Sequence, residues 1–118
     1  MRSVLEFPDI EAGDGKRQTL GFDFGRFLPA GVTLVTNPTV EIHVIEGDDP
    51  SPSDRLIGAA VIGTIPLAER GSGKSNTAIL QQVGNFPGTV EYVIAAACER
   101  SDGDTANMWT HIKAVLPA

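Results

Sequence analysis

The residues best suited to chemistry lie in one glycine-rich stretch, Ala68-Glu69-Arg70-Gly71-Ser72-Gly73-Lys74-Ser75. It fits the relaxed phosphate-loop pattern, with alanine in place of the first glycine. In such a loop the backbone amides face the phosphates, Lys74 neutralises phosphate charge and Ser75 binds magnesium. The pattern needs a strand before it and a helix after it, and the rest of the chain supplies no second strand-helix-strand unit. We interpret residues 68–75 as a flexible strand connection, and a small nucleotide-binding or hydrolytic protein using them is the alternative function.

The chain has two histidines, His43 and His111, which are candidate bases or metal ligands. Each falls on the polar side of an alternating segment, and no pair has the short spacing that marks a metal or catalytic site. The serine of Gly71-Ser72-Gly73 lacks the spacing of a nucleophile elbow. We expect both histidines at solvent-facing strand positions, predict no catalytic residues, and expect the chain not to be an enzyme.

Paired carboxylates and one cysteine complete the candidates. Asp48/Asp49 and Asp102/Asp104 carry oxygens that calcium prefers, but neither pair matches a twelve-residue calcium loop. The second pair, on either side of Gly103, is typical of a hairpin turn. Cys98 follows an apolar run and is expected to be a small buried core residue. The sequence therefore predicts neither a metal nor a cofactor.

Short strands joined by turns must position these residues, because Val, Ile and Thr together number 28 against 8 Leu. The segment at 89–99 is the longest apolar strand, and it should pair as a hairpin with the last strand, which follows the Asp102-Gly103 turn signal. With about six or seven such segments, the chain is expected to be all-β, an antiparallel β-sandwich. Strands are expected at 20–27, 40–45 (after an Asn37-Pro38 turn), 57–65, 89–99 and 108–115.

Some segments need separate treatment. Residues 46–55, acidic and rich in Pro and Ser, are expected to form an exposed loop. Residues 77–83 fit either a strand or a helix. Tyr92, four residues after Gly88, is a candidate tyrosine corner whose hydroxyl binds upstream backbone. Trp109 is expected in the core or at a subunit interface.

The overall composition limits the domain count and the partners. The chain has 118 residues, enough for one packed domain, and a net charge of -6 argues against nucleic acid as a partner. No apolar run approaches the roughly 20 residues that span a bilayer, and the first residues lack the pattern of a secretory signal, so neither membrane insertion nor secretion is expected.

The N-terminal segment has a different pattern from the rest. Residues 1–18 contain scattered apolar positions followed by a polar stretch with two glycines, which predicts an extended N-terminal arm before a domain at 19–118. An arm of this kind can become ordered along a neighbouring subunit. Its apolar residues are the predicted partner-binding residues: Val4, Leu5, Phe7 and Ile10.

Four segments taken in order resemble a known family: Gly21-Phe22-Asp23-Phe24 followed by Phe27-Leu28, then residues 79–84, 88–94 and 101–104. Together they are similar to the fibre-tail adaptors, small structural proteins of tailed bacteriophages. Phe24 stands where family members often have Trp, and residues 46–55 look like an insertion.

The resemblance implies an immunoglobulin-like sandwich without enzymatic activity. Such a protein sits in several copies around the phage tail and joins tail fibres to it through protein-protein contacts. Its partners would be tail and tail-fibre proteins, and its location the virion, after synthesis in the host cytoplasm.

Overall fold

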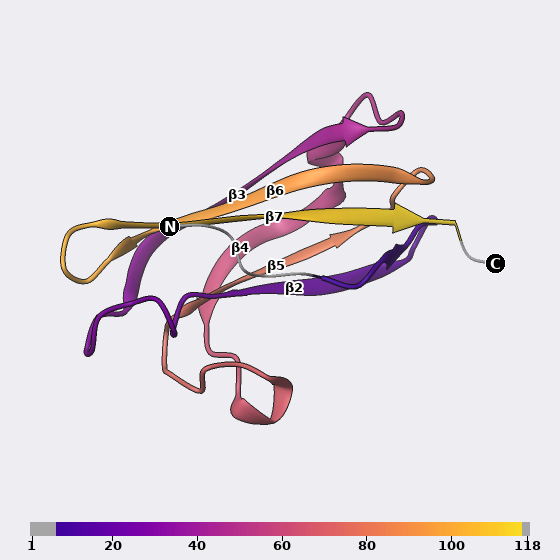
Figure 1. Cartoon of the computed structure of the whole chain (residues 1–118). Coiled ribbons are helices and arrows are strands. Elements are labelled where there is room, and N and C mark those ends of the chain that lie inside the picture. The colour runs from indigo at the N-terminus through magenta and orange to yellow at the C-terminus, as the bar shows by residue number, and fades with distance from the viewer. Residues whose placement is uncertain (1–6, 117–118) are drawn as a thin grey trace.

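The computed structural model describes residues 7–116, which form two β-sheets facing each other (Figure 1). The all-β prediction is confirmed. One sheet has the order β1-β7-β6-β3 and the other the order β2-β5-β4. The strands of the first are β1 (Ile10–Glu11), β7 (Thr105–Val115), β6 (Val90–Arg100) and β3 (Leu34–Glu46). Those of the second are β2 (Arg17–Asp23), β5 (Ala78–Gly84) and β4 (Leu56–Gly63).

The hairpin of β6 and β7 is the longest regular part of the molecule. Its register runs without a shift from Val90 opposite Ala114 to Glu99 opposite Thr105, which confirms the predicted pairing. The turn contains Gly103 with a φ of 92°, a conformation that glycine adopts without steric cost. β7 begins at Thr105, three residues before the predicted start at 108.

Residues 77–83, which fit either a strand or a helix by sequence, fall almost entirely in strand β5. Residues 78–84 are extended and pair with both β2 and β4. The register of β4 is interrupted between Ile57 and Val61. There the Gln81 side-chain amide donates to the carbonyls of Ile57 (3.4 Å) and Gly58 (3.2 Å). The buried Gln81 side chain thus provides hydrogen bonds at the position where the ladder is irregular.

One hydrophobic core fills the space between the two sheets. Phe22 and Phe24 are both buried with the half-buried Asp23 between them, as their alternation predicts. Large side chains of the opposite sheet, including Tyr92 and Met108, are buried in the same cluster. Burying each such side chain contributes on the order of 1.5–3 kcal/mol.

Two strands differ from expectation in extent or burial. The Asn37-Pro38 pair, expected as a turn, lies inside β3, where Asn37 has a φ of 57° and the register shifts between Thr36 and Thr39. This bulge lets the strand begin at Leu34. β4, expected to be mostly buried, is an edge strand of its sheet and has no fully buried residue.

The described part of residues 1–18 packs on its own domain. Ile10–Glu11 pairs parallel with Ala114 and Val115, and Ile10 is only 2% exposed. The Phe7 ring packs edge-on against Phe22, with 5.6 Å between centroids. β2 already begins at Arg17, so a domain boundary at 18/19 would cut a strand.

Residues 46–55 are mostly exposed, as expected, but the buried Asp49 anchors them to the core. The Tyr92 hydroxyl donates to Asp49 Oδ2 (2.7 Å), and Arg55 Nε lies 3.5 Å from the same oxygen. Asp49 Oδ1 accepts from the Ser51 amide (3.0 Å), and the chain continues into a short 3-10 helix, Pro52–Arg55. The acceptor for Tyr92 is therefore a buried carboxylate and not the backbone of a tyrosine corner. Burial and the hydrogen bond to Asp49 raise the pKa of Tyr92 above its ordinary value.

Candidate functional site

Residues 68–75, the phosphate-loop-like segment, connect two antiparallel strands. They begin inside a short 3-10 helix, Leu67–Glu69, which comes after β4, and the chain then enters β5, which pairs antiparallel with β4. A phosphate loop is instead followed by a helix, whose N-terminus helps bind the anion. The Lys74 ammonium donates to the Gly25 carbonyl (3.0 Å), and the Lys74 carbonyl accepts from the Thr77 hydroxyl (2.7 Å). Lys74 therefore ties this connection to the neighbouring loop.

The Asp23 carboxylate fixes the other side of the same connection. Asp23 Oδ2 accepts from the Ser72 amide (2.6 Å), and Oδ1 accepts from the Ser72 hydroxyl (2.9 Å) and the Gly25 amide (2.8 Å). A Cβ on Gly71 would lie 2.0 Å from the Ile65 carbonyl oxygen. Here glycine permits close packing of two backbones, which is a structural reason for its presence.

Within residues 7–116, the two histidines and the paired carboxylates do not come together in one site. His43 and His111 are both exposed, as predicted, and both lie in register with Val93, on the strands to either side of it. Asp102 closes the hairpin turn: it accepts from Arg100 and from the Asp104 amide. The guanidinium of Arg100 lowers the pKa of the Asp102 carboxyl. Within residues 7–116 no three or more His, Cys, Asp or Glu side chains come together as a possible metal site.

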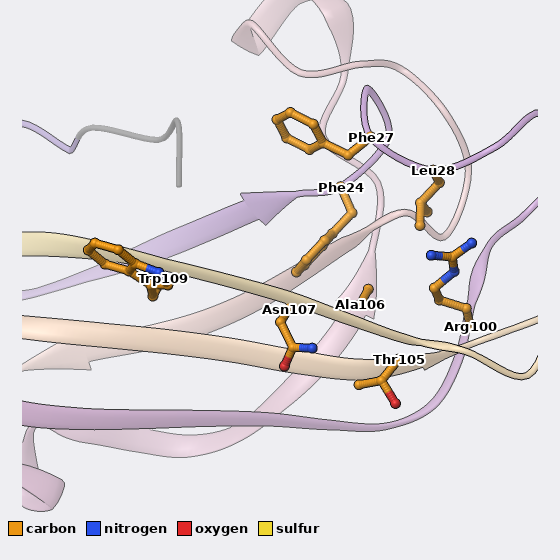
Figure 2. Close-up of a pocket in the computed structure, with 8 residues that line it drawn as sticks. All are labelled: Phe24, Phe27, Leu28, Arg100, Thr105, Ala106, Asn107 and Trp109. Atoms are coloured by element: carbon orange, nitrogen blue, oxygen red, sulfur yellow. The ribbon is translucent and has the colours of Figure 1, made fainter. Parts of the chain in front are cut away.

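A cavity beside β7 is the surface feature that the sequence analysis missed. Its volume is about 340 Å³. Phe24, Phe27 and Leu28 line it from the loop after β2, and Arg100 and the first part of β7 line it from the sheet (Figure 2). The loop folds back into this position through a turn in which the Phe27 and Leu28 amides donate to the Phe24 carbonyl (2.9 and 3.0 Å). The remaining lining residues are Thr105, Ala106, Asn107 and Trp109.

Two aromatic side chains of this cavity are unusually exposed. Phe27 is 40% and Trp109 50% exposed. Trp109 lies on the outer face of its sheet, so it is not a core residue of this chain. The alternation of side chains along β7 indicates the exposure of Trp109. Because Met108 is buried, the next side chain must point to the opposite face. Exposed aromatics beside a concave surface are typical of contacts with another molecule.

The cavity adjoins an open strand edge. On one side β7 pairs with β6 along its length, and on the other side, among the described residues, it pairs only at Ala114 and Val115. The Val115 carbonyl accepts from the Ala12 amide and so points to the open side, whereas the Asp104 carbonyl accepts from Arg100 and points toward β6. Backbone groups alternate in direction along a strand. The open-side positions are therefore Thr105, Asn107, Trp109 and His111.

The predicted partner-binding residues fall in two groups. Ile10 is in the core and Phe7 packs against it, so this chain alone buries Ile10 and part of Phe7. Val4 and Leu5 lie outside the described residues. Of the large apolar residues that are exposed in the described part of the chain, Phe27 and Trp109 line this cavity, and a candidate docking site can be built there.

Comparison with known proteins adds no relative: no protein-family model, curated protein or solved structure matches the chain. Within residues 7–116, the structure has no helix of the length and apolarity needed to cross a membrane.

Proposed function

We propose that this chain is an immunoglobulin-like β-sandwich that acts as a non-enzymatic structural adaptor in a phage virion, where it attaches tail fibres to the tail. The strand orders support the fold assignment. A sheet of β2, β5 and β4 facing one of β7, β6 and β3 matches the B-E-D and G-F-C sheets of an immunoglobulin-like domain. β1, parallel to the end of β7, occupies the place of a short first strand.

The segments that resemble fibre-tail adaptors are those that determine the core and one turn. Phe22 and Phe24, then Ile79 and Val83, lie in the core. Residues 101–104 form the tight turn between β6 and β7. The resemblance therefore concerns residues on which the fold depends, and the adaptor role is inferred from that likeness.

The observation that carries the docking role is the open edge of β7 beside the exposed rings of Phe27 and Trp109. Apolar side chains at a concave surface favour protein contacts, which is what an adaptor needs. The partners we propose are tail and tail-fibre proteins, with several copies of the chain arranged around the tail.

Electron microscopy of particles that encode this chain tests the adaptor role. We expect density for several copies of the domain at the junction of tail and fibres, and particles without the chain should lack attached fibres. Fully fibred particles without the chain, or a purified chain found only outside particles, would contradict the proposal.

A further inference from the structure

We propose that two copies of this chain associate through the open edges of their β7 strands, which pair antiparallel about a two-fold axis at Met108. This deepens the proposed adaptor function, on which it rests for the close placement of several copies. A two-fold dimer buries the same surface of both subunits, so that surface must complement itself. The edge of β7 meets this requirement in its backbone groups, its apolar side chains and its charges.

The edge of β7 differs from the other strand edges. β3 has three register shifts and contains Pro38, and β4 has one shift, which makes both strands poor templates for further pairing. β2 is as regular as β7, since it pairs with β5 from Arg17 to Asp23 without a shift. Within residues 7–116, however, none of the large exposed apolar residues lies on β2, whereas Trp109 lies on β7. The edge of β7 is therefore both regular and able to bury apolar surface in a dimer.

The open side of β7 selects the register of the pair. Among the described residues, β1 covers only the end of this side, and the remaining open-side positions are every second residue from Thr105 to His111. In antiparallel pairing, two residues that lie opposite each other exchange both backbone hydrogen bonds at alternate positions. An axis at Met108 places Thr105 opposite His111 of the second copy and Asn107 opposite Trp109 of the second copy. This register uses all four open-side positions.

The same register covers the exposed rings beside the edge. Trp109 is 50% and Phe27 40% exposed, and both line the cavity of about 340 Å³ (Figure 2). Because Trp109 is next to the axis, the two Trp109 side chains become diagonal neighbours on the outer face of the joined sheet, within reach of each other. The two cavities flank the axis, so each faces apolar atoms of the other copy. Burial of these rings favours association.

The charges along β7 complement those of a second copy. Asp102 and Asp104 lie at the start of the strand, in the turn after β6, and Lys113 lies near its end. Pairing about Met108 places Lys113 of each copy opposite Gly103 of the other, beside both carboxylates. Among the described residues, the side chains of Asp104 and Lys113 have no ion-pair partner. Complementary charges of this kind favour association and fix its register.

Two features of the chain oppose association. The net charge of -6 makes two copies repel each other at long range. Glu91 in β6 lies in register with Lys113 of its own copy and competes for that charge. The contact between Lys113 and the acidic turn acts at short range and occurs twice in a symmetric pair. Reversing these charges therefore tests the proposal more sharply than adding salt.

Sedimentation of the full chain measures the association. We expect a monomer–dimer equilibrium with a Kd below about 100 µM. Trp109 is the only tryptophan of the sequence, so its fluorescence emission should shift to shorter wavelength as the protein concentration rises. Hydrogen exchange at the Asn107 and Trp109 amides should slow over the same range of concentration. A monomer at every concentration up to about 1 mM, or a dimer without these two changes, would overturn the proposal.

A charge exchange between two variants tests the register. Lys113→Glu and Asp104→Lys each bring like charges together at both ends of the pair, so each variant alone should dimerise at least about tenfold more weakly. In an equimolar mixture, the substituted side chain of one variant meets that of the other, and both contacts again join opposite charges. The mixture should therefore associate better than either variant alone, and its failure to do so would refute this register.

Two control variants accompany these measurements. Arg70→Glu, at an exposed position in the connection after β4, changes the net charge as much as Lys113→Glu and should alter the affinity by at most about twofold. Trp109→Ala removes the ring beside the axis and should weaken association at least about tenfold. Leu67→Ala, at an exposed apolar residue outside the cavity, should not. Equal affinities of Trp109→Ala and Leu67→Ala would contradict the proposal.

Other occupants of the edge give different results. A full chain that stays monomeric, and dimerises through β7 only after deletion of residues 1–6, would assign the edge to its own N-terminal segment. A dimer whose affinity responds to neither Lys113→Glu nor Trp109→Ala would assign association to another surface. Both results refute the proposal. Neither decides the adaptor role, because the particle experiment tests that role separately.

Discussion

The buried contact between Asp49 and Tyr92 gives the sharpest prediction about stability. Asp49→Ala removes the acceptor of two hydrogen bonds, from the Tyr92 hydroxyl at 2.7 Å and the Ser51 amide at 3.0 Å, and the ion-pair partner of Arg55, whose Nε lies 3.5 Å away. The Asp49 side chain is 2% exposed and the Arg55 side chain 14% exposed. Water therefore replaces the lost acceptor poorly, and a nearly buried guanidinium loses its counter-charge.

The expected magnitude follows from this burial. Breaking a buried ion pair by removing one partner costs about 3–5 kcal/mol. That is a large part of the 5–15 kcal/mol by which a typical domain is stable. For a domain of this size we expect Tm to fall by roughly 10–25 °C. Urea and thermal unfolding followed by circular dichroism measure both quantities.

Two further variants make the result interpretable. Asp48→Ala changes the exposed neighbouring carboxylate and should alter the free energy of unfolding by less than about 0.5 kcal/mol. Tyr92→Phe removes the hydroxyl alone and leaves Asp49 with Arg55, so it should cost less than Asp49→Ala. A loss below about 1 kcal/mol for Asp49→Ala would refute the reasoning, because it would mean that the carboxylate is not part of a buried network.

Three other predictions concern pH, the irregular strand and the phosphate-loop-like connection. The raised pKa of Tyr92 means that the folded chain holds this proton more tightly than the unfolded chain does. The free energy of unfolding should therefore fall as pH rises above about 10. Alkaline unfolding curves measure this fall, and Tyr92→Phe should remove part of it. Gln81→Leu should cost about 1–3 kcal/mol in urea unfolding, because it leaves β4 carbonyls without their donor; equal costs for Gln81→Leu and the exposed Gln82→Leu would contradict this. A labelled nucleotide with magnesium should show no saturable binding to the chain, and saturable binding abolished by Lys74→Ala would favour the alternative function.

Much of the fold could be predicted from local pattern. The period of two in residues 20–24 places Phe22 and Phe24 on one side, and they are indeed buried together. The Asp102-Gly103 turn signal between two apolar segments correctly indicates the longest hairpin. These features depend only on neighbouring residues, which is why sequence is sufficient for them.

Other features depend on residues far apart in the chain. Asp49 sits among polar residues and looks exposed, yet its burial requires a tyrosine 43 positions later. β1 has two residues, too few to show a period, so its pairing with β7 could not be recognised. The cavity exists because one edge of a sheet has a loop packed beside it, and strand order decides which edge that is.

The single cysteine, Cys98, can report on local opening or unfolding of this domain. Cys98 is 2% exposed, its thiol donates to the Thr36 carbonyl (3.2 Å), and burial raises its pKa. Thiol reagents attack the deprotonated, accessible form, so Cys98 becomes reactive when β3 separates from β6 or the domain unfolds. Since the sequence has one cysteine, the rate at which a thiol reagent modifies the chain reports on the separation of β3 from β6 or on unfolding, without any engineered label.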